Sequence, residues 1–174
     1  MNSFAELSDA RFSVRKFDPL PVEREKLDLL LRAAQAAPTA CNCQPQKLFV
    51  LQSDEAKNRL RPALRFWFES PLVILFCCDT DLVCKIPQER PDYHTGEMDV
   101  SIVCTEVMMQ AADLGLGSVW VRGFLCGDVK KAMDLPENLQ PVCCLFVGYP
   151  APDAKPHPKL HFSRRPIDEI AKIL

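Results

Sequence analysis

Two arginines and a serine alternate near the start of the chain, in the run Arg11-Phe12-Ser13-Val14-Arg15. In an extended segment alternate side chains point to the same side, so both guanidinium groups and the hydroxyl would face one object. Guanidinium groups match phosphate oxygens in a bidentate way, which makes a small phosphate monoester the natural ligand. A solvated face or a kinase-accessible stretch is the alternative interpretation of the same pattern.

A second polar segment, residues 37–45, joins a predicted helix to a predicted strand and has the sequence Ala-Pro-Thr-Ala-Cys-Asn-Cys-Gln-Pro. The amide side chains of Asn42 and Gln44 can both donate and accept hydrogen bonds, which suits the edge of a heteroaromatic ring. A polar loop between two strong elements is where chemistry is commonly found. We therefore expect ligand contacts here, with a simple turn as the alternative.

A third segment, residues 115–123, contains glycines that would let the backbone approach a ligand closely. The segment is not a dinucleotide fingerprint, because it follows a helix and has Trp120 at the third glycine position. A Rossmann fold is therefore excluded. A hydrolase triad is not expected either, since Ser13 has no histidine in its motif and no Gly-x-Ser-x-Gly elbow occurs.

Hydrophobic periodicity predicts the elements that must position these three segments. Helices are predicted over residues 4–10, 22–36, 53–68, 97–114, 128–133 and 167–174, and strands over residues 47–52, 72–78, 117–121 and 141–149. Strands interleaved with helices predict an α/β/α sandwich, although periodicity alone leaves the strand directions open.

The longest predicted loop, residues 79–96, has the length of a lid or binding loop. Tyr93 supplies a stacking face with a hydroxyl, and His94 could donate a proton near neutral pH, so both are candidate substrate contacts. A surface loop that merely covers apolar residues is the alternative. The helix over residues 97–114 is apolar nearly all round, which predicts a central position or a subunit interface.

The composition describes one globular domain spanning residues 1–174. The chain is 48% hydrophobic and 25% charged, and its net charge of -2 disfavours nucleic-acid binding. Its longest apolar runs, residues 71–78 and 141–147, are far below the roughly 20 residues of a membrane span. The first residues lack both a basic leader and a long apolar stretch, so we expect a cytoplasmic protein that does not contact a membrane.

Nine cysteines raise the question of disulfides or a metal site. The number is odd, and the pairs 77–78 and 143–144 lie inside apolar runs, so most are expected to be core residues. No Cys-x-x-Cys occurs and no histidine has ligand spacing with a cysteine pair, so no metal is expected. Cys41 and Cys43 flank Asn42 and are the one pair open to redox chemistry, although ordinary loop residues are the favoured interpretation.

Taken in order, these segments resemble the nitroreductase family of FMN-dependent oxidoreductases. The resemblance covers nearly the whole chain and rests on five segments in family order, since each is common alone. They are residues 11–17 (Arg-Phe-Ser-Val-Arg-Lys-Phe) before a Leu-rich helix, residues 37–45, residues 114–120 (Leu-Gly-Leu-Gly-Ser-Val-Trp), Leu135-Pro136, and residues 147–150 (Val-Gly-Tyr-Pro).

The resemblance implies an α+β fold with a mainly antiparallel central sheet, and an interlocked homodimer whose C-terminal tail extends onto the partner subunit. It implies that FMN is the cofactor and that the loop after the second helix approaches the flavin from the partner. The implied cofactor-binding residues are Arg11, Phe12, Ser13 and Arg15 with Arg164 or Arg165 at the phosphate and ribityl chain, Pro38, Thr39, Ala40, Asn42 and Gln44 in the partner's loop, and Ser118, Val119, Trp120, Val121, Arg122 and Gly123 beside the ring.

The implied reaction takes a hydride from NAD(P)H to the flavin and then reduces a nitroaromatic or quinone-like acceptor, a small molecule that Trp67 or Phe124 could also contact. The flavin carries the chemistry, so no catalytic side chain is required. Three departures favour an alternative, a flavin-binding module without turnover such as a redox sensor or an FMN-sequestering protein. Gln46 replaces a usual aromatic residue, Thr105-Glu106 replaces a usual Gln and Asn, and residues 63–67 lack an Asn and Lys for a nicotinamide cofactor.

Overall fold

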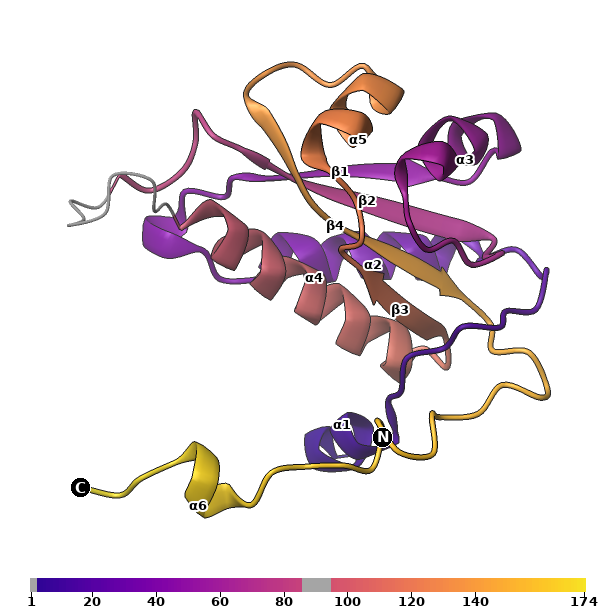
Figure 1. Cartoon of the computed structure of the whole chain (residues 1–174), viewed down its shortest axis with the longest axis vertical. Helices are drawn as coiled ribbons and strands as arrows, with labels where there is room; N and C mark the ends of the chain where they lie inside the picture. Colours follow the sequence, from indigo (N-terminus) through magenta and orange to yellow (C-terminus); the bar gives the residue numbers. More distant parts are fainter. Residues whose placement is uncertain (1–2, 86–94) are drawn as a thin grey trace.

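The computed structural model describes residues 3–85 and 95–174, and its helices surround one sheet (Figure 1). The four strands are β1 (Gln46–Leu51), β2 (Leu72–Asp79), β3 (Gly117–Val121) and β4 (Leu139–Gly148). Their order across the sheet is β1-β2-β4-β3, and each neighbouring pair is antiparallel. The expected antiparallel sheet is confirmed.

Helices cover both faces of the sheet, which confirms the expected α/β/α sandwich. The helices are α1 (Phe4–Ala10), α2 (Arg24–Ala36), α3 (Asp54–Leu60), α4 (Gly96–Asp113), α5 (Cys126–Met133) and α6 (Ile167–Ile170), with short 3-10 helices η1 (Ala40–Asn42) and η2 (Arg61–Ala63). α2 and α4 pack on one face, and α3 and α5 pack on the other.

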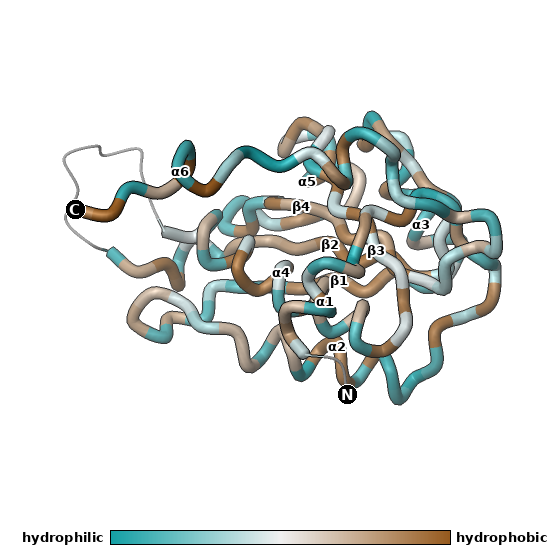
Figure 2. Tube along the Cα trace, turned by 90° about the horizontal axis from the view of Figure 1, so that it is seen from below, coloured by the Kyte–Doolittle hydropathy of each residue, from teal (hydrophilic) through white to brown (hydrophobic). Residues whose placement is uncertain are grey.

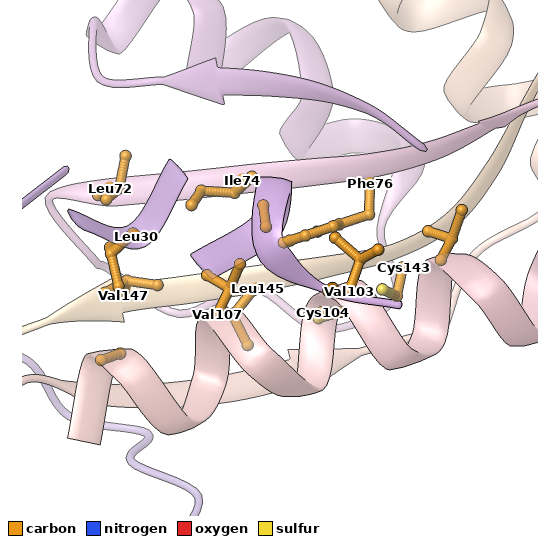
Figure 3. Packing of buried hydrophobic residues seen from close by; sticks show 14 of the residues in the cluster. Leu30, Leu72, Ile74, Phe76, Val103, Cys104, Val107, Cys143, Leu145 and Val147 are labelled. Atoms are coloured by element: carbon orange, nitrogen blue, oxygen red, sulfur yellow. The ribbon is translucent and has the colours of Figure 1, made fainter. Parts of the chain in front are cut away.

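Strand β2 explains why the chain contains an uninterrupted apolar run. Its side chains alternate, so that Leu72, Ile74 and Phe76 enter the core under α2 and α4 (Figure 3), whereas Val73 and Leu75 enter the core under α3 and α5. Each of these five side chains is fully buried. Because both faces of this strand are buried, its sequence does not alternate between apolar and polar residues.

Two predicted helices are wrong at their C-terminal ends. The helix predicted over residues 53–68 begins as expected, with the Ser53 hydroxyl accepting from the N–H of Ala56 at 3.2 Å, but α3 ends at Leu60. Pro62 lies in η2, and a proline lacks the amide that would continue the helix. The helix predicted over residues 167–174 is the single turn α6, which buries no residue and so lacks the packing that stabilises a short helix.

The cysteines follow the expectation of a thiol-rich core. Cys77, Cys78, Cys104, Cys143 and Cys144 are buried, and no disulfide links any cysteine of the described residues. Burial raises the pKa of the Cys77 thiol to about 12 and that of Cys144 well above its ordinary value, so these thiols stay protonated and inert. Over residues 3–85 and 95–174, no helix combines the length and apolarity needed to cross a membrane.

Gly148 at the end of β4 provides a test of the close packing between the sheet and the segments beside it. A Cβ at this position would lie 2.6 Å from Cδ of Pro71, whose ring cannot rotate away. We expect Gly148→Ala to lower the free energy of unfolding by about 1–3 kcal/mol through overpacking. Urea unfolding at fixed protein and cofactor concentration measures this change.

Gly127 in α5 is the matched control, because a Cβ there would meet no atom within 4 Å. Gly127→Ala should leave the protein as stable or raise its stability by up to about 1 kcal/mol, since alanine favours helix. Equal urea midpoints for the two variants would show that the space around Gly148 is not tight.

Candidate functional site

The arginine-rich segment near the N-terminus lies along β3 as an extended strand-like stretch. Ser13 forms a parallel bridge with Ser118, and the N–H of Val14 donates to the carbonyl of Ser118 at 2.9 Å. Val14 is buried against Gly117, where an added Cβ would lie 2.5 Å from the valine side chain. Because Val14 points inward, its neighbours Ser13 and Arg15 point outward, as the alternation predicts.

A cavity of about 120 Å³ brings this segment together with the C-terminal tail. It is lined by Arg11, Phe12, Ser13, Arg15, His157, Leu160, His161 and Arg164. The rings of Phe12 and His161 meet edge to face, with 6.2 Å between their centroids. Of the two tail arginines considered from the sequence, Arg164 lines this cavity and Arg165 does not.

The cavity is positively charged, because its three guanidinium groups form no ion pair with a carboxylate in the described parts of the chain. Arg15 donates to the carbonyl of Ser13 at 3.1 Å and Arg164 to that of Ser163 at 2.9 Å, which leaves the remaining N–H groups available. Guanidinium groups and a hydroxyl in one cavity are the donor set that a phosphate monoester requires.

A second cavity of about 360 Å³ adjoins the first and has mainly apolar walls. It is lined by Arg15, Phe66, Phe68, Val119, Trp120, Val121, Arg122 and Gly123. Gly123 allows close packing here, since a Cβ would lie 2.9 Å from the ring of Phe66. Arg15 lines both cavities, so a ligand with an anionic end and a flat apolar end could occupy the two together.

Ser118 lies on β3 opposite Ser13, and it lines a neighbouring cavity that Arg11 and Phe12 also line. Its side chain is 3% exposed, and its hydroxyl oxygen has no hydrogen-bond partner among the described residues. A buried hydroxyl without a partner costs free energy, and such groups are commonly satisfied by a ligand or water. The sequence places Ser118 in the candidate site, but only the structure shows this unsatisfied group.

The polar loop after α2 has an unusual backbone conformation. Cys41, Asn42 and Gln44 all have left-handed φ values, of 51°, 55° and 51°. For residues other than glycine this costs roughly 1–2 kcal/mol each, and such strain is concentrated at functional sites. Two hydrogen bonds hold the loop: the N–H of Gln44 donates to the Thr39 hydroxyl at 3.0 Å, and the N–H of Ala40 donates to Oδ1 of Asp99 at 2.9 Å.

Asp99 is a supporting residue that the sequence reasoning missed. It lies in the first turn of α4, is 3% exposed, and has its second carboxylate oxygen, Oδ2, without a partner in the described structure. The sequence did contain a signal for this role: an aspartate occupies a position on the buried face of the predicted helix. Buried acids are almost always paired, so a partner could have been expected.

The loop lies beside the start of α4, whereas the segment of residues 11–15 that lines the arginine cavity lies beside β3, near the end of α4 (Figure 1). Asp99, which binds the loop, is in the first turn of this helix, whereas Ser118 follows its last residue by only a few positions. With about 1.5 Å of rise for each of its 18 residues, α4 is about 27 Å long. One chain therefore does not bring Asn42 and Gln44 to the arginine cavity.

The residues predicted to contact the substrate do not lie together in one cavity of the described structure. Trp67 packs its ring on Phe146 in the core, with 5.1 Å between centroids, and Phe124 lies under the guanidinium of Arg122 at 4.7 Å. Neither lines the apolar cavity. Phe66 and Phe68 line it instead. In an extended segment, residues two apart point to the same side, and this alternation could have predicted that Phe66 and Phe68 face one cavity. Tyr93 and His94, with residues 86–92 of the predicted lid, lie outside the described residues.

No group of three or more histidine, cysteine, aspartate or glutamate side chains that could hold a metal ion occurs in residues 3–85 and 95–174. The donors gathered at β3 are instead cations and hydroxyls, which suit an anion. The arrangement can therefore bind an anionic, ring-containing molecule and carry out chemistry that such a molecule brings with it.

Comparison with known proteins gives consistent matches over the whole chain. The sequence model of the Nitroreductase family matches residues 9–71 and 63–149. A crystal structure of a nitroreductase family protein from Clostridium difficile 630 is similar with a TM-score of 0.89 and 37% identity, covering 99% of this chain and 98% of that one.

Two curated relatives carry names that state a reaction. FMN reductase (NAD(P)H) of Bacillus subtilis strain 168 is 29% identical over 171 residues, which cover 88% of this chain and 68% of the relative. NADPH-flavin oxidoreductase of Vibrio harveyi is 27% identical over 173 residues, which cover 92% of this chain and 72% of the relative.

Proposed function

This chain belongs to the nitroreductase family, and we propose that it is an FMN-dependent NAD(P)H oxidoreductase that reduces nitroaromatic or quinone-like acceptors. The observation that carries the proposal is a cationic cavity and an apolar cavity that share Arg15 as a lining residue. FMN has this same division into a phosphate and a flat ring. The names of the two curated relatives support the same cofactor and electron donor.

At the phosphate end, Arg11, Ser13, Arg15 and Arg164 would hold the anion. Their three positive charges have no carboxylate partner in the described chain, so a phosphate would supply the missing counter-charge. Charge-assisted hydrogen bonds of this kind contribute about 1.5–3 kcal/mol each. The Ser118 hydroxyl, buried without a partner nearby, fits the ribityl hydroxyls as a further contact.

At the ring end, the backbone of residues 119–123 and the rings of Phe66 and Phe68 would form the walls. A bound flavin accepts a hydride from NAD(P)H and passes electrons to a second substrate in the same site. The chain itself orients the ring, excludes water with apolar walls and presents the charge of Arg15. Phe66, half exposed, offers a stacking surface to a planar acceptor, which favours aromatic acceptors over aliphatic ones.

We further propose that the active form is a homodimer. Packing two copies along α4 in opposite directions would place the loop of one chain, with Asn42 and Gln44, near the arginine cavity of the other. Apolar residues recur along the tail around α6, which Figure 2 draws in brown. The large apolar side chains that one chain leaves exposed there are Leu160, Phe162, Ile167, Ile170, Ile173 and Leu174. A partner subunit would bury them.

Sedimentation equilibrium tests the dimer directly. At micromolar concentration we expect a mass of about 39 kDa, twice the 19.6 kDa of one chain. Loss of the tail beyond residue 158 should shift the population toward monomer, because it removes the exposed apolar residues. A stable monomer that retains its full flavin content would contradict the proposal.

The two neighbouring tail arginines provide a matched test of the phosphate site. Arg164→Ala should weaken FMN binding by about ten- to a hundredfold, as should Arg11→Ala and Arg15→Ala, because each removes a charge-assisted contact. Arg165→Ala removes the same charge one residue away, outside the cavity, and should change the affinity little. Quenching of free flavin fluorescence measures each dissociation constant, and equal losses for Arg164 and Arg165 would exclude the assigned geometry.

Anaerobic stopped-flow mixing with NADH or NADPH tests turnover. We expect the visible absorbance of the bound flavin to disappear at least as fast as the enzyme turns over in the steady state. The absorbance should return when a nitroaromatic or quinone acceptor is added. Flavin that stays oxidised with both nucleotides would instead favour a binding module without turnover, such as a redox sensor or an FMN-sequestering protein. This alternative would account for two departures from the family pattern. Glu106 is exposed, and the side-chain oxygen of Gln46 is buried without a hydrogen-bond partner in the described residues.

A further inference from the structure

Two cysteines that are distant in sequence meet beside the strained loop after α2. Cys41 lies in η1, and Cys84 follows the end of β2, 43 residues later. Their sulfur atoms are 3.3 Å apart, and the thiol of Cys84 donates to the sulfur of Cys41. This pair is at the N-terminal end of α4, at the opposite end from the arginine cavity.

The pair is accessible to solvent. Cys43 of the same loop is half-buried and also acts on the Cys84 thiol, but the sulfur contact of 3.3 Å joins Cys84 to Cys41. Cys41 is exposed and Cys84 is half-buried, whereas five of the remaining cysteines are enclosed in the core. Cys126, also half-buried, has its thiol near the Pro141 carbonyl at 3.4 Å, and no hydrogen bond joins it to another cysteine in the described structure. Accessibility and a neighbouring thiol together are what reversible oxidation requires.

Backbone hydrogen bonds anchor the two segments that carry these cysteines. The N–H of Ala40 donates to the Asp99 carboxylate, and the N–H of Asp79 donates to the carbonyl of Pro45 at 2.7 Å, which joins the start of β1 to the end of β2. The two sulfur atoms need to approach by about 1.2 Å to reach the ~2.05 Å of a disulfide bond. Rotation about side-chain bonds in a surface loop can supply a movement of that size.

We propose that Cys41 and Cys84 form a redox-active dithiol site that exchanges with small-molecule disulfides of the glutathione type. In the first step the Cys41 sulfur attacks one sulfur of the small disulfide, and the first small thiol leaves with the Cys41 proton. In the second step the Cys84 sulfur attacks Cys41 in the mixed disulfide, and the second small thiol leaves with the Cys84 proton. The protein dithiol is oxidised and one small disulfide is reduced to two thiols.

The difference in exposure between the two thiols assigns their roles. Cys41 is exposed and Cys84 is half-buried, so a small disulfide reaches the Cys41 sulfur first. The hydrogen bond to Cys41 is the largest cause that raises the pKa of Cys84, which favours its protonated form. Cys41 is therefore the attacking residue, and Cys84 is the resolving residue.

A disulfide here would fix the loop that carries Asn42 and Gln44 to the segment after β2. If that loop approaches the flavin of a second chain, oxidation would alter the cofactor environment; this consequence rests on the proposed function. Formation of the disulfide itself does not, because it depends only on the two thiols and the added reagent.

The test uses the full-length protein with FMN in buffers of defined reduced and oxidised glutathione, followed by alkylation of free thiols and peptide mass spectrometry. We expect wild type to lose two thiols per chain and to give a peptide linked between Cys41 and Cys84. Cys43→Ser, which removes the adjacent loop thiol, should give the same linked peptide. Cys84→Ser should stop at a glutathione adduct on Cys41, and in Cys41→Ser the adduct on Cys84 should form about tenfold more slowly.

Several outcomes would overturn the proposal. These are a link between Cys41 and Cys43, separate glutathione adducts on both Cys41 and Cys84 in wild type, or no thiol loss in oxidising buffer. Circular dichroism of each variant confirms that it is folded. The readout is independent of flavin reduction, so a protein that forms the link but is not bleached by NADH or NADPH would disprove only the proposed function.

Discussion

Burial of the sheet on both faces is the constraint on which the rest of this structure depends. With α2 and α4 on one face and α3 and α5 on the other, all but one of the side chains of β2 and all but one of those of β4 are buried. Ligands can therefore reach the sheet only at its edges and ends. The outer edge of β3 is where the N-terminal arginine segment pairs, so Ser13 and Arg15 are held against the sheet rather than on a free loop.

Helix α4 imposes the second constraint, because it separates the two groups of polar residues that the chain provides. Its first turn anchors the strained loop through Asp99, and its end leads directly into β3. A single chain keeps these two regions about one helix length apart. The proposed second copy, running the other way along α4, would both cover the exposed apolar residues of the tail and bring the loop to the arginine cavity.

The cysteines divide into two populations for the same structural reason. Those on β2, β4 and α4 face the packed layers, where desolvation raises the pKa of Cys77 to about 12 and keeps it as a small apolar residue. Cys41 and Cys84 lie where connecting segments leave the sandwich, so they keep access to solvent. Cysteine therefore packs as a small apolar residue between the layers, and it presents accessible thiols where the connecting segments leave them.

The sequence by itself determined the features that depend on near neighbours in the chain. Alternation placed Ser13 and Arg15 on one side, periodicity located the strands and α4, and Ser53 marked the start of α3. It overextended α3 because the apolar pattern continues past Pro62 as an extended segment, whose Phe66 and Phe68 then face a cavity while Trp67 faces the core.

Only the tertiary structure decided which distant residues meet. It selected Arg164 over Arg165 at the cationic cavity, gave Cys41 its neighbour Cys84 in place of the adjacent Cys43, and separated the loop from the arginines along α4. Periodicity reports which face a residue occupies, but it does not report which face of another element lies opposite. That choice depends on the order of the strands and the paths between them, which are set by packing of the whole chain.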